Sequence, residues 1–280
     1  MNMQLASTST QRTYRYVRLT ILGAVFALAV SLIIVVAADG PVTSLSALFY
    51  TPGRTVFTGV LFAVALALLA LSGHSVEQVL LDVAALFAPL IAVIPTPLGV
   101  GDAPGVECPG QTPCVPAEYT AGVHNGVITF VVVVIVGAGC ALVLGRGQRT
   151  MSRGVVIAVA AAVVVALAML VWLLVWPAAL LQTGHLVVTA GFFGLMSAVA
   201  VVSAVASVGR WRVIYLVVAI GMAASLLFLA AVGIARLAGA DLAGQPWILV
   251  GEVGLIAFFA AFWIAQTAQK WNEVDPSLLA

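Results

Sequence analysis

Residues 154–176 read GVVIAVAAAVVVALAMLVWLLVW, an unbroken apolar run without a charged side chain. A helix of about 20 such residues crosses the hydrocarbon core of a bilayer. The run shows no alternation of apolar and polar residues, which a strand of a membrane β-barrel would require. Because a backbone in lipid must satisfy its own hydrogen bonds, this stretch predicts a transmembrane α-helix.

The whole chain repeats this pattern. Of its 280 residues, 63% are hydrophobic and only 8% are charged, and the mean hydropathy is +1.20. Soluble domains carry about 25% charged residues, so the composition excludes a water-soluble fold. We expect an all-α integral membrane protein, a bundle of eight transmembrane helices in a single domain, 18–268. The expected spans are 18–38, 56–73, 78–95, 122–144, 154–176, 185–208, 213–236 and 247–268.

The first span ends V-A-A-D at residues 36–39, which is similar to a signal-peptide cleavage site. The apolar region of a signal peptide is typically about 7–15 residues long, and this run is longer. Retention as a membrane anchor is therefore favoured. Cleavage would leave seven helices.

The distribution of basic residues predicts the topology. If the N-terminus is cytoplasmic, the inner segments, including the tails 1–17 and 269–280, hold nine of the eleven basic residues, and only Arg54 and Arg236 lie outside. The reverse orientation would violate the positive-inside rule. We therefore expect a plasma-membrane protein with both termini in the cytoplasm. The nine inner residues are Arg12, Arg15, Arg18, Arg146, Arg149, Arg153, Arg210, Arg212 and Lys270.

The longest loop, 96–121, is rich in proline and glycine and is expected to be extracytoplasmic. It contains Cys108 and Cys114, six residues apart, on the side of the membrane where disulfides persist. We expect these two residues to form a disulfide; two unpaired thiols are the alternative.

Arg54 is an unusual residue to find at the entrance of the second helix. In the stretch A-L-F-Y-T-P-G-R (47–54), Thr51 is a good N-cap and Pro52 suits the first helical position, so the helix is expected to begin at about 52. A cation in the first turn opposes the helix dipole, and on the outer side it opposes the positive-inside rule. A partner anion would offset both effects; the alternative is an arginine that extends to lipid phosphate.

Glu252 is the second unusual residue, because it lies in the apolar stretch I-L-V-G-E-V-G-L-I of the last helix. It is about five residues from the outer end, or roughly 8 Å deep at 1.5 Å per residue. A carboxylate at that depth must be paired or protonated. Pairing with Arg54 is one outcome, and proton exchange or ligand contact is the other.

Two histidines lie at the same outer boundary, His124 at the start of the fourth helix and His185 at the start of the sixth. Topology alone therefore places both histidines, Arg54 and Glu252 at similar depth. Tyr50 immediately precedes the arginine. These residues define a hypothetical outward-facing polar pocket, with lipid headgroups or a small anion as its ligand.

Two acidic residues lie at the inner side. Asp82 is four or five residues into the third helix, where it either belongs to a separate inner site or hydrogen-bonds across helices. Glu77, in the short inner loop before it, is expected to be solvated.

Three segments resemble a family of uncharacterised bacterial multi-pass membrane proteins, the DUF998 and Frag1/DRAM/Sfk1-like groupings. Residues 44–61, S-L-S-A-L-F-Y-T-P-G-R-T-V-F-T-G-V-L, are similar to the family pattern S-x-x-[YF]-Y-T-x-x-R. Residues 82–96 resemble its third helix, and 252–263 resemble a W-x-E…W helix near its C-terminus. The resemblance implies a bacterial plasma-membrane protein. It adds weight to Tyr50, Thr51, Arg54, Asp82, His124 and Glu252 as site residues.

Three functions remain open. The first is binding or transport of a lipid headgroup or small anionic solute. The second is a metal-dependent lipid hydrolase resembling the ceramidase and progestin-receptor-like superfamily, with His124, His185 and Glu252 as zinc ligands; its late H-x-x-x-H pair is missing here. The third is an assembly subunit of a membrane complex. We expect no cofactor and no nucleic acid, and we expect membrane lipids as partners.

Overall fold

The computed structural model describes the chain apart from residues 1–8, 72–74, 100, 107, 109–112, 148–150, 241, 243–244 and 273–280. The described residues form eight α-helices and one 3₁₀ turn, η1. Their bounds are α1 Ser9–Asp39, η1 Ser46–Tyr50, α2 Arg54–Ala70, α3 Val76–Val93, α4 Ala117–Gly147, α5 Arg153–Val175, α6 Pro177–Ala206, α7 Gly209–Leu237 and α8 Trp247–Gln269.

The predicted all-α membrane bundle is confirmed. Among the described residues, seven helices are long and apolar enough to cross a membrane. The eighth, α2, has only 17 residues and spans about 25 Å. It begins at Arg54, two residues later than expected, and it follows the fully buried turn η1. The Thr51 hydroxyl accepts a hydrogen bond from the backbone N–H of Gly53 (3.2 Å), so it stabilises the turn before the helix rather than capping the helix itself.

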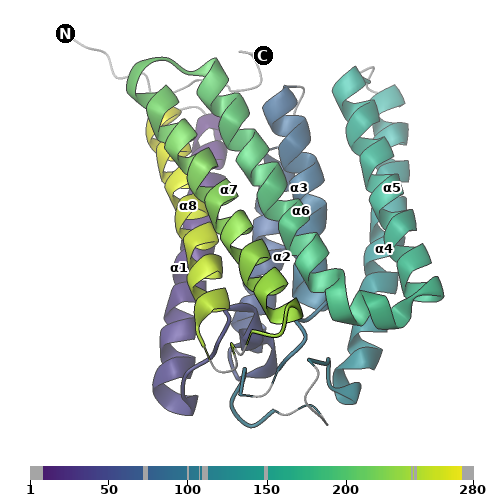
Figure 1. Ribbon diagram of the computed structural model, residues 1–280. Helices are drawn as coiled ribbons and strands as arrows, with labels where there is room; N and C mark the ends of the chain where they lie inside the picture. Colours follow the sequence, from purple (N-terminus) through teal and green to yellow (C-terminus); the bar gives the residue numbers. More distant parts are fainter. Residues whose placement is uncertain are drawn as a thin grey trace.

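The helices run up and down, so that successive connections alternate between two faces (Figure 1). The face at which α1 begins and α8 ends is called the terminal face here. The opposite face, which carries the segments 40–53 and 94–116, is called the loop face. The described residues near both ends of the chain meet at the terminal face, where the Arg15 Nε donates a hydrogen bond to the Trp271 carbonyl (2.7 Å).

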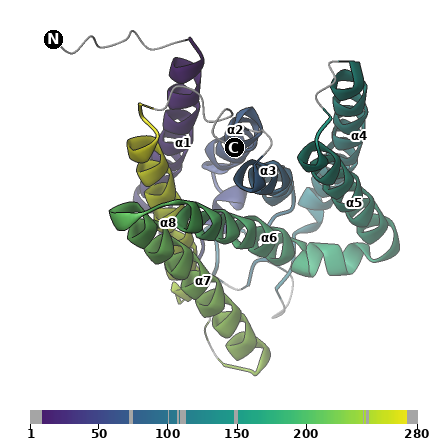
Figure 2. The same ribbon diagram turned by 90° about the horizontal axis from the view of Figure 1, so that it is seen from above.

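The helices divide into a main group and an outlying pair. Seen from above, α3 and α6 lie centrally, α1, α7 and α8 lie on one side, and α4 and α5 stand together on the other (Figure 2). Helix α6 packs closely against both α3 and α7, and α7 packs against α8. At the last contact Gly221 leaves room for the Phe258 ring, because a Cβ there would lie 2.3 Å from that ring.

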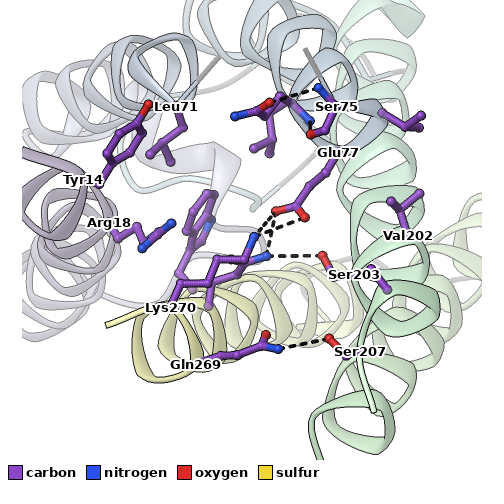
Figure 3. Close-up of a pocket in the computed structure, with 16 residues that line it drawn as sticks. Tyr14, Arg18, Leu71, Ser75, Glu77, Val202, Ser203, Ser207, Gln269 and Lys270 are labelled. Atoms are coloured by element: carbon purple, nitrogen blue, oxygen red, sulfur yellow. Dashed lines mark hydrogen bonds and ion pairs between the residues drawn. The ribbon is translucent and has the colours of Figure 1, made fainter. Parts of the chain in front are cut away.

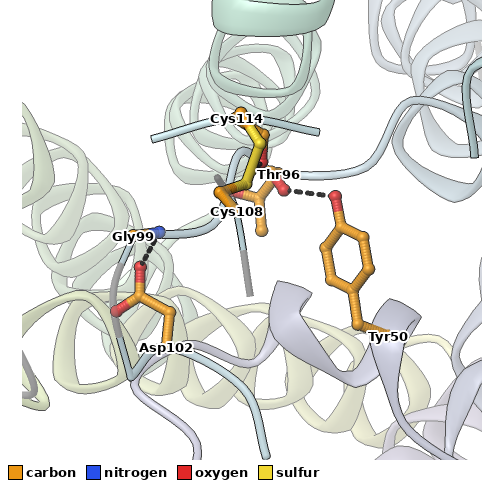
Figure 4. The surroundings of a disulfide bond; sticks show 6 residues. All are labelled: Tyr50, Thr96, Gly99, Asp102, Cys108 and Cys114. Atoms are coloured by element: carbon orange, nitrogen blue, oxygen red, sulfur yellow. Dashed lines mark hydrogen bonds between the residues drawn. A yellow bond between two sulfur atoms is a disulfide. The ribbon is translucent and has the colours of Figure 1, made fainter. Parts of the chain in front are cut away.

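The loop face is held together by a disulfide and by hydrogen bonds between its segments. Cys108 and Cys114 are joined, as the sequence predicts (Figure 4). The Asp102 carboxylate accepts the Gly99 N–H (2.7 Å) and the Thr43 hydroxyl (2.5 Å). These bonds tie the long loop to the segment that precedes η1 and thereby fix η1 beneath the bundle.

Candidate functional site

Four segments meet around one serine hydroxyl at the loop face. The Glu252 Oε1 of α8 lies 2.5 Å from the Ser46 Oγ of η1, and its Oε2 accepts the backbone N–H of Leu45 at 2.5 Å. The His185 Nε2 of α6 lies 2.8 Å from the same Ser46 Oγ. The His185 Nδ1 lies 2.7 Å from the carbonyl oxygen of Ile94, just after α3. We call Glu252, Ser46 and His185 the buried network.

Glycines bring the helices of the buried network close together. Beside His185, a Cβ on Gly184 would lie 3.2 Å from the Ile94 side chain, so the glycine lets α6 approach the end of α3. Beside Glu252, a Cβ on Gly251 would lie 2.5 Å from the Leu229 side chain, so the glycine lets that side chain of α7 pack against the backbone of α8. Small residues at such positions are how membrane helices pack tightly without a hydrophobic driving force between them.

A narrow apolar cavity lies beside the buried network. Its volume is about 60 Å³, and it is lined by residues of α1, η1, α2, α3, α6 and α8, of which only Ser46, Thr189 and Glu252 are polar. The Thr189 hydroxyl is buried and has no hydrogen-bond partner among the described residues. Because ligand pockets usually measure about 300–1,000 Å³, this cavity is too small for a whole ligand in the conformation seen here.

Arg54 and Glu252 do not meet. The Arg54 side chain is exposed, and its guanidinium lies 4.2 Å from the ring centre of Phe49 and 5.3 Å from that of Tyr119. Among the described residues no carboxylate forms an ion pair with it. The arginine is therefore stabilised by aromatic rings at the surface, and the expected two-charge pocket is not formed.

The other predicted residues lie apart from the buried network. The Tyr50 hydroxyl donates to the Thr96 carbonyl oxygen (2.7 Å), and burial raises the pKa of Tyr50 above its ordinary value (Figure 4). His124 is exposed on α4. One carboxyl oxygen of Asp82 is buried without a hydrogen-bond partner among the described residues, and Asp82 does not line the cavities at either face. Of the predicted pocket residues, only His185 and Glu252 belong to the buried network, whereas Tyr50 and Arg54 both contact the Tyr119 ring.

The described residues contain no set of zinc ligands for the metal-dependent hydrolase. Within the part of the chain that the structure describes, no three His, Cys, Asp or Glu side chains are grouped so that they could hold a metal ion. His185 and Glu252 are linked through Ser46, whereas His124 is exposed on another helix.

The contact between Ser46 and His185 has the spacing of a nucleophile and its base. Two features oppose acyl transfer at this serine. The Glu252 carboxyl occupies a second position on the Ser46 hydroxyl and would repel a developing oxyanion. The nearby Leu45 N–H is already bonded to that carboxyl. The arrangement is suited to holding and moving protons rather than to attack on a carbonyl.

A larger and more polar cavity opens at the terminal face. Its volume is about 320 Å³, within the range of ligand sites. We call it the terminal-face cavity. Its polar and charged lining residues are Tyr14 and Arg18 of α1, Ser75, Glu77 and Gln78 at the start of α3, Ser203 and Ser207 at the end of α6, and Gln266, Gln269 and Lys270 at the end of α8.

An ion pair crosses the terminal-face cavity. The Lys270 Nζ lies 3.0 Å from the Glu77 Oε1, to which the Gln266 amide also donates at 2.8 Å (Figure 3). The same amide reaches the Ser203 hydroxyl at 3.2 Å. Glu77 is therefore paired and half-buried, and the expectation that it is solvated was wrong because α8 brings a cation to it.

Two buried donors also line the terminal-face cavity. Arg18 is only 4% exposed, and Trp263 is 1% exposed. The indole nitrogen of Trp263 has no hydrogen-bond partner among the described residues. With two cations against the single acid Glu77, the lining carries a net positive charge and an unused N–H donor.

Sequence reasoning missed the terminal-face cavity, although one signal was present. Gln266, Gln269 and Lys270 recur at helical spacing near the end of an otherwise apolar helix, so they share one face. Only the fold shows that this face meets Glu77 and Arg18.

Comparison with known proteins does not identify this chain: no family model, no curated protein and no solved structure matches it.

Proposed function

We propose that this multi-pass membrane protein binds an anionic oxygen group, carried by a lipid headgroup or by a small solute, in the terminal-face cavity. The observation that carries the proposal is a cavity of about 320 Å³ lined by Arg18, Lys270 and Trp263, whose buried indole N–H has no hydrogen-bond partner among the described residues. A buried N–H without a partner is costly, and an anionic acceptor would satisfy that of the Trp263 indole.

Charge favours an anion over a cation at this site. Glu77 is already engaged by Lys270 and by Gln266, so it offers little to a cationic ligand. Lys270 can turn further N–H donors toward a ligand, because an ammonium group has three. The arginine adds a charge that no pH in the physiological range removes.

The position of the cavity indicates how a ligand would reach it. The terminal face is the one that the positive-inside rule predicts to be cytoplasmic. The lining residues lie near the ends of α1, α3, α6 and α8. With this face in the cytoplasm, headgroups of the inner leaflet and cytoplasmic solutes would both be within reach of them. The proposal therefore keeps the lipid-headgroup or anionic-solute ligand expected from the sequence and moves its site to the other face. At the loop face, contact between Arg54 and lipid phosphate stays a prediction.

Titration of the purified protein tests this proposal and separates the two sources. Glycerol 3-phosphate and inorganic phosphate are titrated by calorimetry into protein in neutral detergent. In parallel, retention of phosphatidylglycerol against phosphatidylcholine is measured by native mass spectrometry. Binding of the soluble anions indicates a solute site, and selective retention of the anionic lipid indicates a headgroup site. If none of these probes binds, the proposal is wrong.

Substitutions of charged residues test whether the anion binds in the terminal-face cavity. Lys270→Gln removes a unit charge about 4 Å from the anion, which is worth up to about 4 kcal/mol at an effective dielectric constant of 20, and less after salt screening. We expect a loss of affinity of about tenfold or more. Glu77→Gln should tighten binding. Arg212→Gln, an exposed cation on the same face outside the cavity, is the matched control. Equal effects of the lysine variant and this control would contradict the assignment.

A further inference from the structure

The hydrogen-bond directions in the buried network are restricted by its two ends. The Ile94 carbonyl oxygen can only accept, so the His185 Nδ1, 2.7 Å away, carries a hydrogen. At the other end the backbone N–H of Leu45 can only donate, so the Glu252 Oε2 accepts it. The freedom that remains lies at the Ser46 hydroxyl, between the Glu252 Oε1 and the His185 Nε2.

One serine hydrogen must serve two neighbours, which leaves two consistent arrangements. If Ser46 donates to Glu252, the His185 Nε2 must donate to Ser46, and the pair is carboxylate and imidazolium. If Ser46 donates to His185, the Glu252 Oε1 must carry a hydrogen and donate to Ser46, and both groups are neutral. The two arrangements use the same heavy-atom positions and the same number of protons.

We propose that Glu252, Ser46 and His185 form an intramembrane proton-transfer relay. In the forward step, the bond from hydrogen to the Glu252 Oε1 breaks and a bond to the Ser46 Oγ forms. The original hydroxyl hydrogen of the serine passes to the His185 Nε2. The serine ends as it began, the carboxyl becomes a carboxylate and the imidazole becomes an imidazolium. One proton is displaced, and no oxidant, reductant or other reactant is needed.

Moving this proton is the main change of charge near the cavity, because the described residues around it carry no other ionisable side chain. Among the residues that line the adjoining cavity, which come from α1, η1, α2, α3, α6 and α8, Glu252 is the only ionisable one. His185 is the ionisable group that faces it through Ser46. In the neutral arrangement the cavity wall carries no charge. In the other arrangement Glu252 is a carboxylate in the wall, paired through Ser46 with the His185 imidazolium.

The cavity also gives the relay a route to exchange its proton. Its volume of about 60 Å³ exceeds the roughly 10–15 Å³ that one water molecule needs. The polar residues that line it are Glu252, Ser46 and Thr189, and the Thr189 hydroxyl has no hydrogen-bond partner among the described residues. Glu252 lines this cavity and His185 does not, so the carboxyl is the end of the relay that such a water would meet. The relay does not depend on the proposed anion site, which lies at the opposite face.

Spectroscopy on the full chain in nanodiscs tests the relay. His74 and His124 are replaced by glutamine so that His185 is the sole histidine. Its ring nitrogens are observed by nitrogen-15 solid-state NMR, and the carboxyl stretch of Glu252 by infrared difference spectroscopy, over a series of temperatures at one fixed pH, because the two arrangements hold the same number of protons and pH does not convert one into the other. We expect the protonation of the Nε2 and the ionisation of Glu252 to change together, and Glu252→Gln to leave only the signal of neutral histidine.

Ser46→Ala distinguishes a relay from two groups that titrate separately. Without the bridging hydroxyl, the two signals should change independently, whereas Ser225→Ala, a hydroxyl on α7 outside the network, should leave them coupled. Unchanged coupling in Ser46→Ala would overturn the proposal. If that variant does not fold, the Glu252→Gln spectrum decides, because a histidine signal identical to that of the unaltered network means that the carboxyl does not set the state of the imidazole.

Discussion

Replacing Glu252 by glutamine or by alanine should have very different effects on stability. A glutamine carbonyl can accept the Leu45 N–H, and its amide can donate to Ser46, which then donates to His185. Every bond of the neutral arrangement is preserved, so we expect a change within about 0.5 kcal/mol. Alanine leaves the Leu45 N–H without its acceptor, and an unsatisfied buried donor costs about 1–3 kcal/mol. We therefore expect Glu252→Ala to be less stable than Glu252→Gln by about 1–3 kcal/mol.

Equilibrium unfolding in mixed detergent micelles, followed by circular dichroism, measures this difference. Val253→Ala is the matched control, since Val253 is the next residue of α8 and is 46% exposed on the outside of the bundle. If the alanine variant were as stable as the unaltered protein, the bond from Leu45 would not anchor η1 to α8. A glutamine variant as unstable as the alanine one would mean that the network is held as an ion pair, and the neutral arrangement would be refuted.

Two further predictions concern packing and the loop face. Gly221→Ala places a Cβ 2.3 Å from the Phe258 ring and should destabilise the protein by about 1–3 kcal/mol in the same unfolding assay, whereas Gly233→Ala, with nothing within 4 Å, should be nearly neutral; equal effects would contradict the packing of α7 on α8. Replacing Cys108 and Cys114 by serine should destabilise the loop that they close by about 2 kcal/mol, seen as faster amide hydrogen exchange there; unchanged exchange would show that the disulfide does not constrain the loop.

Much of the fold could be predicted because its signals are local. Each apolar run is long enough to be recognised by itself, and all eight expected spans are helices. The largest differences are at α1, which begins at Ser9 rather than at 18, and at α6, which begins at Pro177 rather than at 185, so that His185 lies two turns inside its helix and not at its start. Helix α4 begins at Ala117 rather than at 122. That difference arises because polar residues such as Glu118 and Thr120 extend a helix beyond the hydrocarbon core, where hydropathy no longer marks it.

The sites were predicted less well, because they depend on which helix faces meet. Depth along the membrane correctly placed His185 and Glu252 at one level, but it could not show that Ser46 lies between them. Depth also grouped Arg54 and His124 with them, although both are exposed. Residues at the same depth on different helices can face each other or face lipid, and hydropathy does not distinguish these cases.

The sequence by itself determined that this chain is a membrane bundle, how its helices alternate, and that Cys108 and Cys114 can pair in a loop. These properties follow from hydrophobic length, charge distribution and spacing, each of which is read along the chain. Only the tertiary structure decided that Glu252 meets Ser46 rather than Arg54, and that the polar end of α8 closes a cavity with α1 and α3. Lipid solvates every apolar helix face about equally well, so the pairing of faces is set by close packing at small residues and by hydrogen bonds between helices distant in sequence.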